Sequence, residues 1–279
     1  MFLFPFLLQA DTTELYWLKN ASMEAAFSVG KGIRLEILRL PGGDNVLRES
    51  KDSSRGLKTW IMTPTEDIRL RDSLSEVPAQ AMKISENEYR FIAEAANPLG
   101  LELEWLVRLD SDNPSLEILH RINNKGEMRP FLSIWSLIAL GPGSLIQVPF
   151  SRSLNLSKNH PNDLAVFPYT DLSDGRISTS RDGLSLSIRE GLESGSVKLG
   201  IVQQDGRLLV ECHGLDLESI VPFDPMAEYP EGGSNITLYA SPANRPDTMG
   251  EAEHVGPLRV LNLGESIEMV QTLRLSLKE

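Results

Sequence analysis

Apolar residues recur at every second position over long stretches of this chain, and this period constrains its fold more than any other feature. The clearest segments are LELEWLVRL (101–109), GLSLSIRE (183–190) and SIEMVQTLRLSL (266–277). In GIRLEILRL (32–40) the same period places Ile33, Leu35 and Ile37 on one face. Because successive side chains of a strand point to opposite faces, the pattern predicts antiparallel strands that are buried on one side.

Turn-forming residues separate these segments, and helical patterns are few. The clearest turns are PGGDN from Pro41, LDSDNP from Leu109, INNKGE from Ile122 and QQDGR from Gln203. One short helical turn is predicted in DLESIVPFDP (216–225), where two prolines would end it. Because an open sheet rarely exceeds about ten strands, we predict an all-β fold, a large antiparallel sandwich of two sheets with few short helices. Residues 11–279 are expected to form a single domain.

The charge and the scarcity of metal-binding residues exclude several classes of function. The formal net charge is −12, which opposes binding to nucleic acid and to anionic membrane surfaces. With four histidines, one cysteine and no HExxH or CxxC motif, we predict no metal site. Nucleotide-binding glycine loops and the Gly-x-Ser-x-Gly nucleophile motif are also absent from the sequence, and no cofactor is predicted.

The sequence begins with the apolar run MFLFPFLLQA. This run is shorter than the roughly 20 apolar residues of a membrane-spanning helix, so no membrane span is predicted. We interpret residues 1–10 as the remnant of a truncated export signal, which would place the protein in the periplasm or outside the cell. The alternative is a hydrophobic first strand, and the protein would then be cytoplasmic.

The segment GEAEHVGPL (250–258) contains the candidate catalytic residues. If this segment is extended, Glu251 and Glu253 share one face, roughly 7 Å apart, and His254 lies on the other face. Paired carboxylates at such a distance can act as acid and base on a sugar. The alternative is an exposed strand face that carries acidic residues for solubility.

Aromatic residues provide candidate sugar-stacking surfaces. Trp60, in GLKTWIMTP, is expected to be partly exposed next to Lys58, and Tyr229 precedes a Pro-Glu-Gly-Gly turn where a rim residue is expected. Trp135 lies in the apolar segment FLSIWSLIAL, which favours packing in the core. We predict Lys58, Trp60, Trp135 and Tyr229 as substrate-binding residues.

Several segments occur together in an order that resembles a known family. They are GLKTWIMTP (56–64), LEILHRINNKGEMRPFLSIWSLIALGPG (116–143), KLGIVQQDG (198–206), YPEGGSNITLYA (229–240) and GEAEHVGPLRVLNLGES (250–266). They resemble an uncharacterised family of bacterial proteins, a domain of unknown function within the galactose mutarotase-like superfamily. The resemblance covers the chain from about Leu15 to its end. It implies a β-supersandwich with a concave sheet face that binds carbohydrate in relatives.

The resemblance also implies roles for particular residues. Enzymatic mutarotases use a glutamate base on a late strand, and Glu251 matches it best, followed by Glu253. They use a histidine acid on a central strand, where this sequence has Trp135, and a second histidine that has no counterpart near SRGLKTW. Because both acid and base are needed to move a proton between ring and anomeric oxygens, this departure implies a poor mutarotase.

Three functions therefore remain open. The first is a carbohydrate-binding protein whose pocket contains Glu251, Glu253 and the aromatic residues. The second is an epimerase-like or lyase-like enzyme that uses Glu251 as general base and Tyr229, Lys58 or His160 as the acid. The third is a structural or partner-binding sandwich whose cleft is filled by its own side chains. We favour the first.

Overall fold

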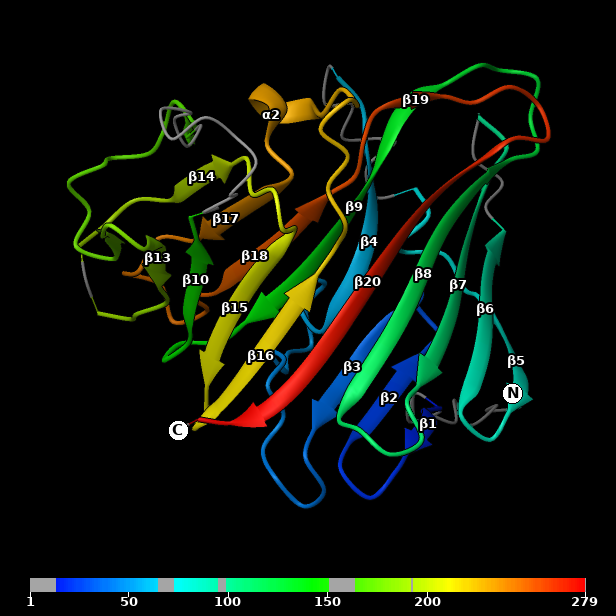
Figure 1. The fold of residues 1–279 in the computed structure, drawn as a ribbon, viewed down its shortest axis with the longest axis horizontal. Helices are drawn as coiled ribbons and strands as arrows, with labels where there is room; N and C mark the ends of the chain where they lie inside the picture. The colour runs from blue at the N-terminus through cyan, green and yellow to red at the C-terminus, as the bar shows by residue number, and fades with distance from the viewer. Residues whose placement is uncertain (1–13, 65–72, 95–98, 151–163, 192, 279) are drawn as a thin grey trace, which may run out of the picture.

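The computed structural model describes residues 14–64, 73–94, 99–150, 164–191 and 193–278. Within these residues the chain forms two antiparallel sheets of ten strands each, stacked face to face (Figure 1). The predicted all-β sandwich is confirmed. Residues 1–10, interpreted as an export signal, and His160 lie outside the described residues.

The first sheet has the strand order β1-β2-β3-β4-β9-β18-β17-β14-β11, and β19 pairs with β9. Its strands are β1 (Tyr16–Lys19), β2 (Glu24–Ser28), β3 (Arg34–Arg39), β4 (Leu57–Met62), β9 (Phe131–Leu140), β11 (Leu164–Val166), β14 (Val197–Ile201), β17 (Ile236–Ala240), β18 (Gly250–Val255) and β19 (Arg259–Val260).

The second sheet has the order β12-β13-β10-β15-β16-β20-β8-β7-β6-β5. Its strands are β5 (Gln80–Ser85), β6 (Glu88–Glu94), β7 (Leu101–Leu109), β8 (Ser115–Asn124), β10 (Leu145–Pro149), β12 (Ile177–Thr179), β13 (Gly183–Ser187), β15 (Arg207–Cys212), β16 (Leu215–Ile220) and β20 (Ser266–Leu277). Its long strand β20 crosses in front of the first sheet in Figure 1.

The apolar residues that recur at every second position of the sequence are buried between the two sheets. Every second residue of β7, from Leu101 to Leu109, is buried in the core, as the alternation predicted. Strand β20 alternates in the same way from Ile267 to Leu275, with Gln271 as the one polar residue of its buried face.

Two local predictions were wrong. The segment predicted to start a helical turn, 216–225, instead begins within strand β16, because its residues alternate between the core and solvent. The described residues contain only one short helical element, α2 (Pro230–Gly233). In β3, Leu38 is buried and Ile37 is only partly buried, since a register shift in the pairing of β2 with β3 interrupts the alternation.

One turn glycine is required by close backbone packing. Gly206, in the QQDGR turn, has φ 62°, and a Cβ atom there would lie 1.6 Å from the carbonyl oxygen of Val221. We expect Gly206→Ala to lower the free energy of unfolding by at least about 2 kcal/mol, because it adds a backbone clash to the strain of a positive φ.

Gly42→Ala is the matched control for this prediction. Gly42 also has a positive φ, 73°, but a Cβ atom there would meet nothing within 4 Å. Chemical denaturation of both variants measures the difference. Equal losses of stability would show that the close approach to Val221 is not what requires glycine.

Among the described residues, none of the helical segments has both the length and the apolar character needed to cross a membrane.

Candidate functional site

The candidate site lies on the face of the first sheet that is turned away from the core. In β18, Glu251 and Glu253 point to this outer face, whereas His254 points to the interior and bonds to Ser219 of the second sheet. The extended conformation predicted for this segment is confirmed. Strand β18 lies between β9 and β17, so both glutamates are in the centre of the sheet.

Both glutamates line one cavity of about 390 Å³, here called the glutamate pocket. Its lining residues are Arg48, Asp52, Ser54, Trp60, Trp135, Tyr169, Lys198, Tyr239, Ser241, Arg245, Asp247, Met249, Glu251 and Glu253. The pocket therefore brings together four of the six residues that the sequence suggested. Lys58 and Tyr229 are not among its lining residues.

Glu253 is held by two groups from the neighbouring strands β9 and β17 and by a third from β14, the next strand beyond β17. Its Oε2 accepts a hydrogen bond from the indole Nε1 of Trp135 at 3.0 Å and another from the hydroxyl of Thr237. The ammonium of Lys198 lies 3.9 Å from the same oxygen. Since Glu253 is 1 % exposed, these contacts replace the water that would otherwise solvate its charge.

Lys198, on β14, is enclosed by charges and rings. Its Nζ lies 2.7 Å from Glu231 Oε1 and within 5 Å of the ring centroids of Trp135 (4.6 Å) and Phe167 (4.7 Å). Burial lowers the pKa of Lys198, but the carboxylates of Glu253 and Glu231 more than offset this effect, so the pKa is raised overall. Lys198 is therefore a fixed cation at neutral pH.

Glu231 reaches Lys198 from a strained turn. Its φ of 51° and ψ of 47° lie in the left-handed region, which is uncommon for a residue with a side chain. Such backbone strain is frequent at functional sites. The sequence drew attention to Tyr229 in this YPEGG segment, but the neighbouring glutamate is the residue that contacts the site.

The expected rim position of Tyr229 was wrong. Tyr229 is 8 % exposed, its ring packs against Phe223 with centroids 5.1 Å apart, and its hydroxyl accepts a hydrogen bond from the backbone N–H of Asp224. The residue thus fixes the loop before α2. A tyrosine that precedes a proline turn can lie either at the rim of a pocket or inside its own loop. Only the packing of the folded chain decides between these two positions.

The two tryptophans form one wall of the pocket. Trp60 and Trp135 are direct neighbours across β4 and β9, with ring centroids 5.1 Å apart in an edge-to-face arrangement. Lys58 lies beneath this wall, because its side chain is 1 % exposed, its Nζ is 3.8 Å from the Trp60 ring centroid, and it donates to the carbonyl of Ser53. It supports the indole rather than lining the pocket.

Loop residues complete the rim. Arg48 forms a two-pronged ion pair with Asp52 (2.9 and 3.2 Å), and this hydrogen bonding lowers the pKa of Asp52 to about 2. Arg245 and Asp247 come from the loop before β18. Our sequence reasoning missed these residues and Lys198. The alternation of apolar residues around Lys198 indicated a strand that would place this lysine on one face of a sheet. The loop residues follow no such alternation and could not be found in this way.

No metal centre is formed by the described residues, in which no group of three or more His, Cys, Asp and Glu side chains is placed to hold an ion.

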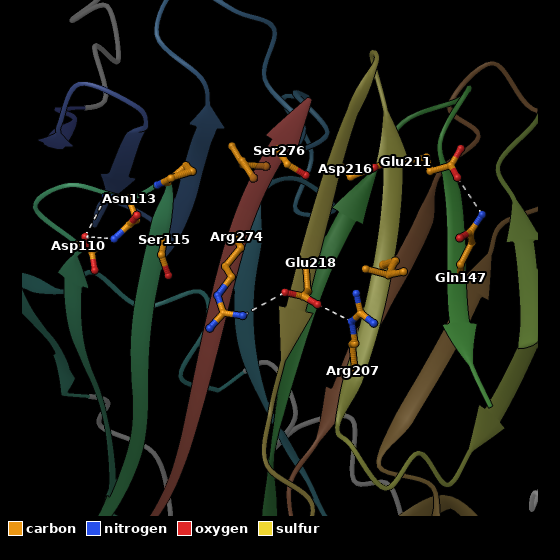
Figure 2. A pocket seen from close by; sticks show the side chains of 13 residues that line it. Asp110, Asn113, Ser115, Gln147, Arg207, Glu211, Asp216, Glu218, Arg274 and Ser276 are labelled. Carbon is orange, nitrogen blue, oxygen red and sulfur yellow. Dashed lines mark hydrogen bonds and ion pairs between the residues drawn. The ribbon is translucent and has the colours of Figure 1, made fainter. Parts of the chain in front are cut away.

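A second hollow, here called the outer hollow, is lined mainly by residues of the second sheet (Figure 2). It measures about 620 Å³. Arg207 and Arg274 both bond to Glu218 there, and Gln147 donates to Glu211 at 3.0 Å. Its lining has no aromatic residue, and these charges bind one another. We therefore consider the glutamate pocket the better candidate for ligand binding.

Comparison with known proteins identified similar structures but no similar sequences. No family model and no curated protein matches the sequence. A galactose mutarotase-like protein from Lactobacillus casei superposes with a TM-score of 0.62 at 11 % identity, covering 94 % of this chain and 100 % of the other.

Two further solved structures give the same result. A galactose mutarotase-like protein from Clostridium acetobutylicum has a TM-score of 0.60 at 9 % identity, with 95 % and 96 % of the two chains covered. The Slr1438 protein of Synechocystis has a TM-score of 0.63 at 15 % identity, with 99 % and 100 % covered. The chain therefore has the fold of the galactose mutarotase-like proteins.

Proposed function

We propose that this protein binds carbohydrate in the glutamate pocket. The observation that carries the proposal is the presence of two indole rings and the carboxylates of Glu251 and Glu253 in one cavity of about 390 Å³. Small-molecule pockets typically measure about 300–1,000 Å³ and combine apolar walls with a few polar groups. A sugar presents C–H faces for the rings and hydroxyl groups for the carboxylates. The fold shared with galactose mutarotase-like proteins supports this ligand class.

Binding is favoured over epimerase or lyase catalysis because the described residues that line the pocket include no proton donor suited to neutral pH. A general acid works best when its pKa is near the working pH. Partial burial is the main cause that raises the pKa of Tyr169 to about 12, and the pKa of Lys198 is raised as well. The described pocket lining includes no histidine. Glu251 would therefore lack an acid partner matched to neutral pH.

Replacing Trp60 tests the proposal. We expect Trp60→Ala to weaken binding of a neutral monosaccharide or oligosaccharide at least about tenfold, because truncating an aromatic hot-spot residue costs about 2 kcal/mol or more of binding energy. Titration calorimetry against a panel of such sugars measures the affinity. NMR of anomeric exchange in the same samples is expected to show rates equal to those in buffer.

Trp17→Ala is the matched control, because Trp17 is a partly exposed indole elsewhere in the first sheet that also carries a lysine, Lys19, 4.1 Å from its ring centroid. The control is expected to bind like the wild type. A wild-type protein that binds no member of the panel would overturn the proposal, and rapid anomeric exchange would favour the enzyme instead.

A further inference from the structure

A continuous chain of buried polar side chains lies between the two sheets, directly beneath the glutamate pocket. Its hydrogen bonds run Trp105–Thr59 (2.9 Å), Thr59–His120 (2.8 Å), His120–Gln271 (3.0 Å), Ser136–Gln271 (2.7 Å), Gln271–Ser219 (2.9 Å) and Ser219–His254 (2.9 Å). All seven residues are at most 1 % exposed. We refer to them as the core network.

The donors of the core network can be ordered along it. The indole Nε1 of Trp105 can only donate, so the hydroxyl proton of Thr59 is left for Nδ1 of His120. Nε2 of His120 then donates to Oε1 of Gln271. The amide Nε2 of Gln271 donates to Ser219, whose Oγ lies 2.9 Å from Nε2 of His254. His120 is thereby assigned the neutral Nε2–H tautomer.

Three members of the core network alternate with pocket residues on the same strands. Thr59 lies between Lys58 and Trp60 on β4, Ser136 follows Trp135 on β9, and His254 follows Glu253 on β18. Since neighbouring residues of a strand point to opposite faces, Trp60, Trp135 and Glu253 are placed by strands whose other face is bound to the network. This part of the pocket and the network are two faces of the same three strands.

Gln271 is where the connections from the two sheets meet. Its Oε1 accepts from Ser136 of the first sheet and from His120 of the second, and its Nε2 donates to Ser219, which bonds to His254 of the first sheet. A slip or tilt of β9 or β18 would break these bonds inside an apolar core, where unpaired polar groups are unfavourable. Apolar packing alone tolerates small shifts more readily.

We propose that Gln271 is a positioning residue for the glutamate pocket. From the opposite sheet it fixes β9 and β18, and so the contact between the Trp135 indole and Glu253 on the far side of those strands. The effect of Gln271 on ligand affinity rests on the proposed carbohydrate binding. Its effect on the contact between Trp135 and Glu253 does not depend on that proposal.

Two variants test this role. Gln271→Met retains the length of the side chain and removes its hydrogen bonds. Ser219→Ala removes the bonds of Ser219 to Gln271 and His254, and keeps those of Gln271 to Ser136 and His120. For both variants we expect the indole N–H resonance of Trp135 to change in ¹H–¹⁵N spectra. We also expect the affinity for the bound sugar to fall by about tenfold or more, as happens when groups that orient the residues of a binding site are removed. Leu217→Ala is the control, because Leu217 is a fully buried core residue outside the network. It is expected to lose stability and keep the wild-type resonance.

The outcomes separate this inference from the proposed function. A folded Gln271→Met or Ser219→Ala protein with the wild-type Trp135 resonance would overturn the positioning role, whatever its stability. If Gln271→Met does not fold, the milder Ser219→Ala variant decides. If the wild type binds no sugar, the proposed function fails, and the Trp135 resonance still tests Gln271. Histidine ¹⁵N shifts that place the proton of His120 on Nδ1 would contradict the assigned direction of the network.

Discussion

Lys198→Met is expected to lower the free energy of unfolding by about 3 to 5 kcal/mol, because it leaves the buried Glu253 and the partly buried Glu231 without their shared cation. Glu231 and Glu253 both lie within 4 Å of the Lys198 ammonium, and Glu253 is almost fully buried. The same change is expected to abolish ligand binding, since Glu253 lines the pocket. Chemical denaturation at neutral pH measures the stability, and calorimetry measures the binding.

A double variant and a surface variant control for this result. Adding Glu253→Gln to Lys198→Met removes one of the unpaired charges and is expected to restore part of the lost stability, as a double-mutant cycle would show. Lys278→Met removes a half-exposed lysine paired with Glu211 and is expected to cost far less. Equal effects of Lys198→Met and Lys278→Met would contradict the view that Lys198 neutralises the buried Glu253 together with the partly buried Glu231.

Lowering the pH from 6.5 to 4.5 is expected to destabilise the protein by about 4 kcal/mol, through its two buried histidines. Burial lowers the pKa of His120 to about 4 and that of His254 to about 3, and a hydrogen bond from His120 to Gln271 opposes only part of the shift. In the unfolded chain both titrate near 6.5, so the unfolded state binds more protons over this range. Stability is therefore fully present above pH 6.5 and is lost as the pH falls, by roughly 1.4 kcal/mol per unit for each histidine.

The choice of pH range isolates the histidines. Carboxylates with a lowered pKa, such as Asp52 and Glu104, also stabilise the folded state, but this contribution is lost mainly below pH 4.5. His254→Gln is expected to halve the dependence of stability on pH between 6.5 and 4.5, as measured by denaturation at each pH. A stability that does not change over this range would show that the histidines are solvated or already charged in the folded protein.

The sequence predicted the strands and the faces of their side chains with good accuracy where a single local rule applied. Alternation placed Leu101 to Leu109 in the core and Glu251 and Glu253 together on the outer face, because the period of a strand depends only on backbone geometry. It failed at Ile37, where a register shift interrupts the period. Gln271 was overlooked, although it is a polar residue at a position where the alternation of 266–277 predicts an apolar one.

The composition of the pocket depended on which strands became neighbours. Lys198 meets Glu253 because β14 pairs with β17 and β17 pairs with β18, over more than fifty residues of sequence. Arg48 and Asp52 reach the same pocket from a loop, and Tyr229 turned away from it into its own loop.

By itself, the sequence determined the β class of the fold, the buried faces of its strands and the pairing of two acids on one face, since these follow from sterics between residues close in the chain. Only the tertiary structure decided that the acids share a pocket with Lys198 and two tryptophans, and that a polar network supports the pocket from below. Those contacts join segments far apart in sequence. Their formation is set by hydrogen-bond pairing between strands and by the packing of two sheets, which no local pattern encodes.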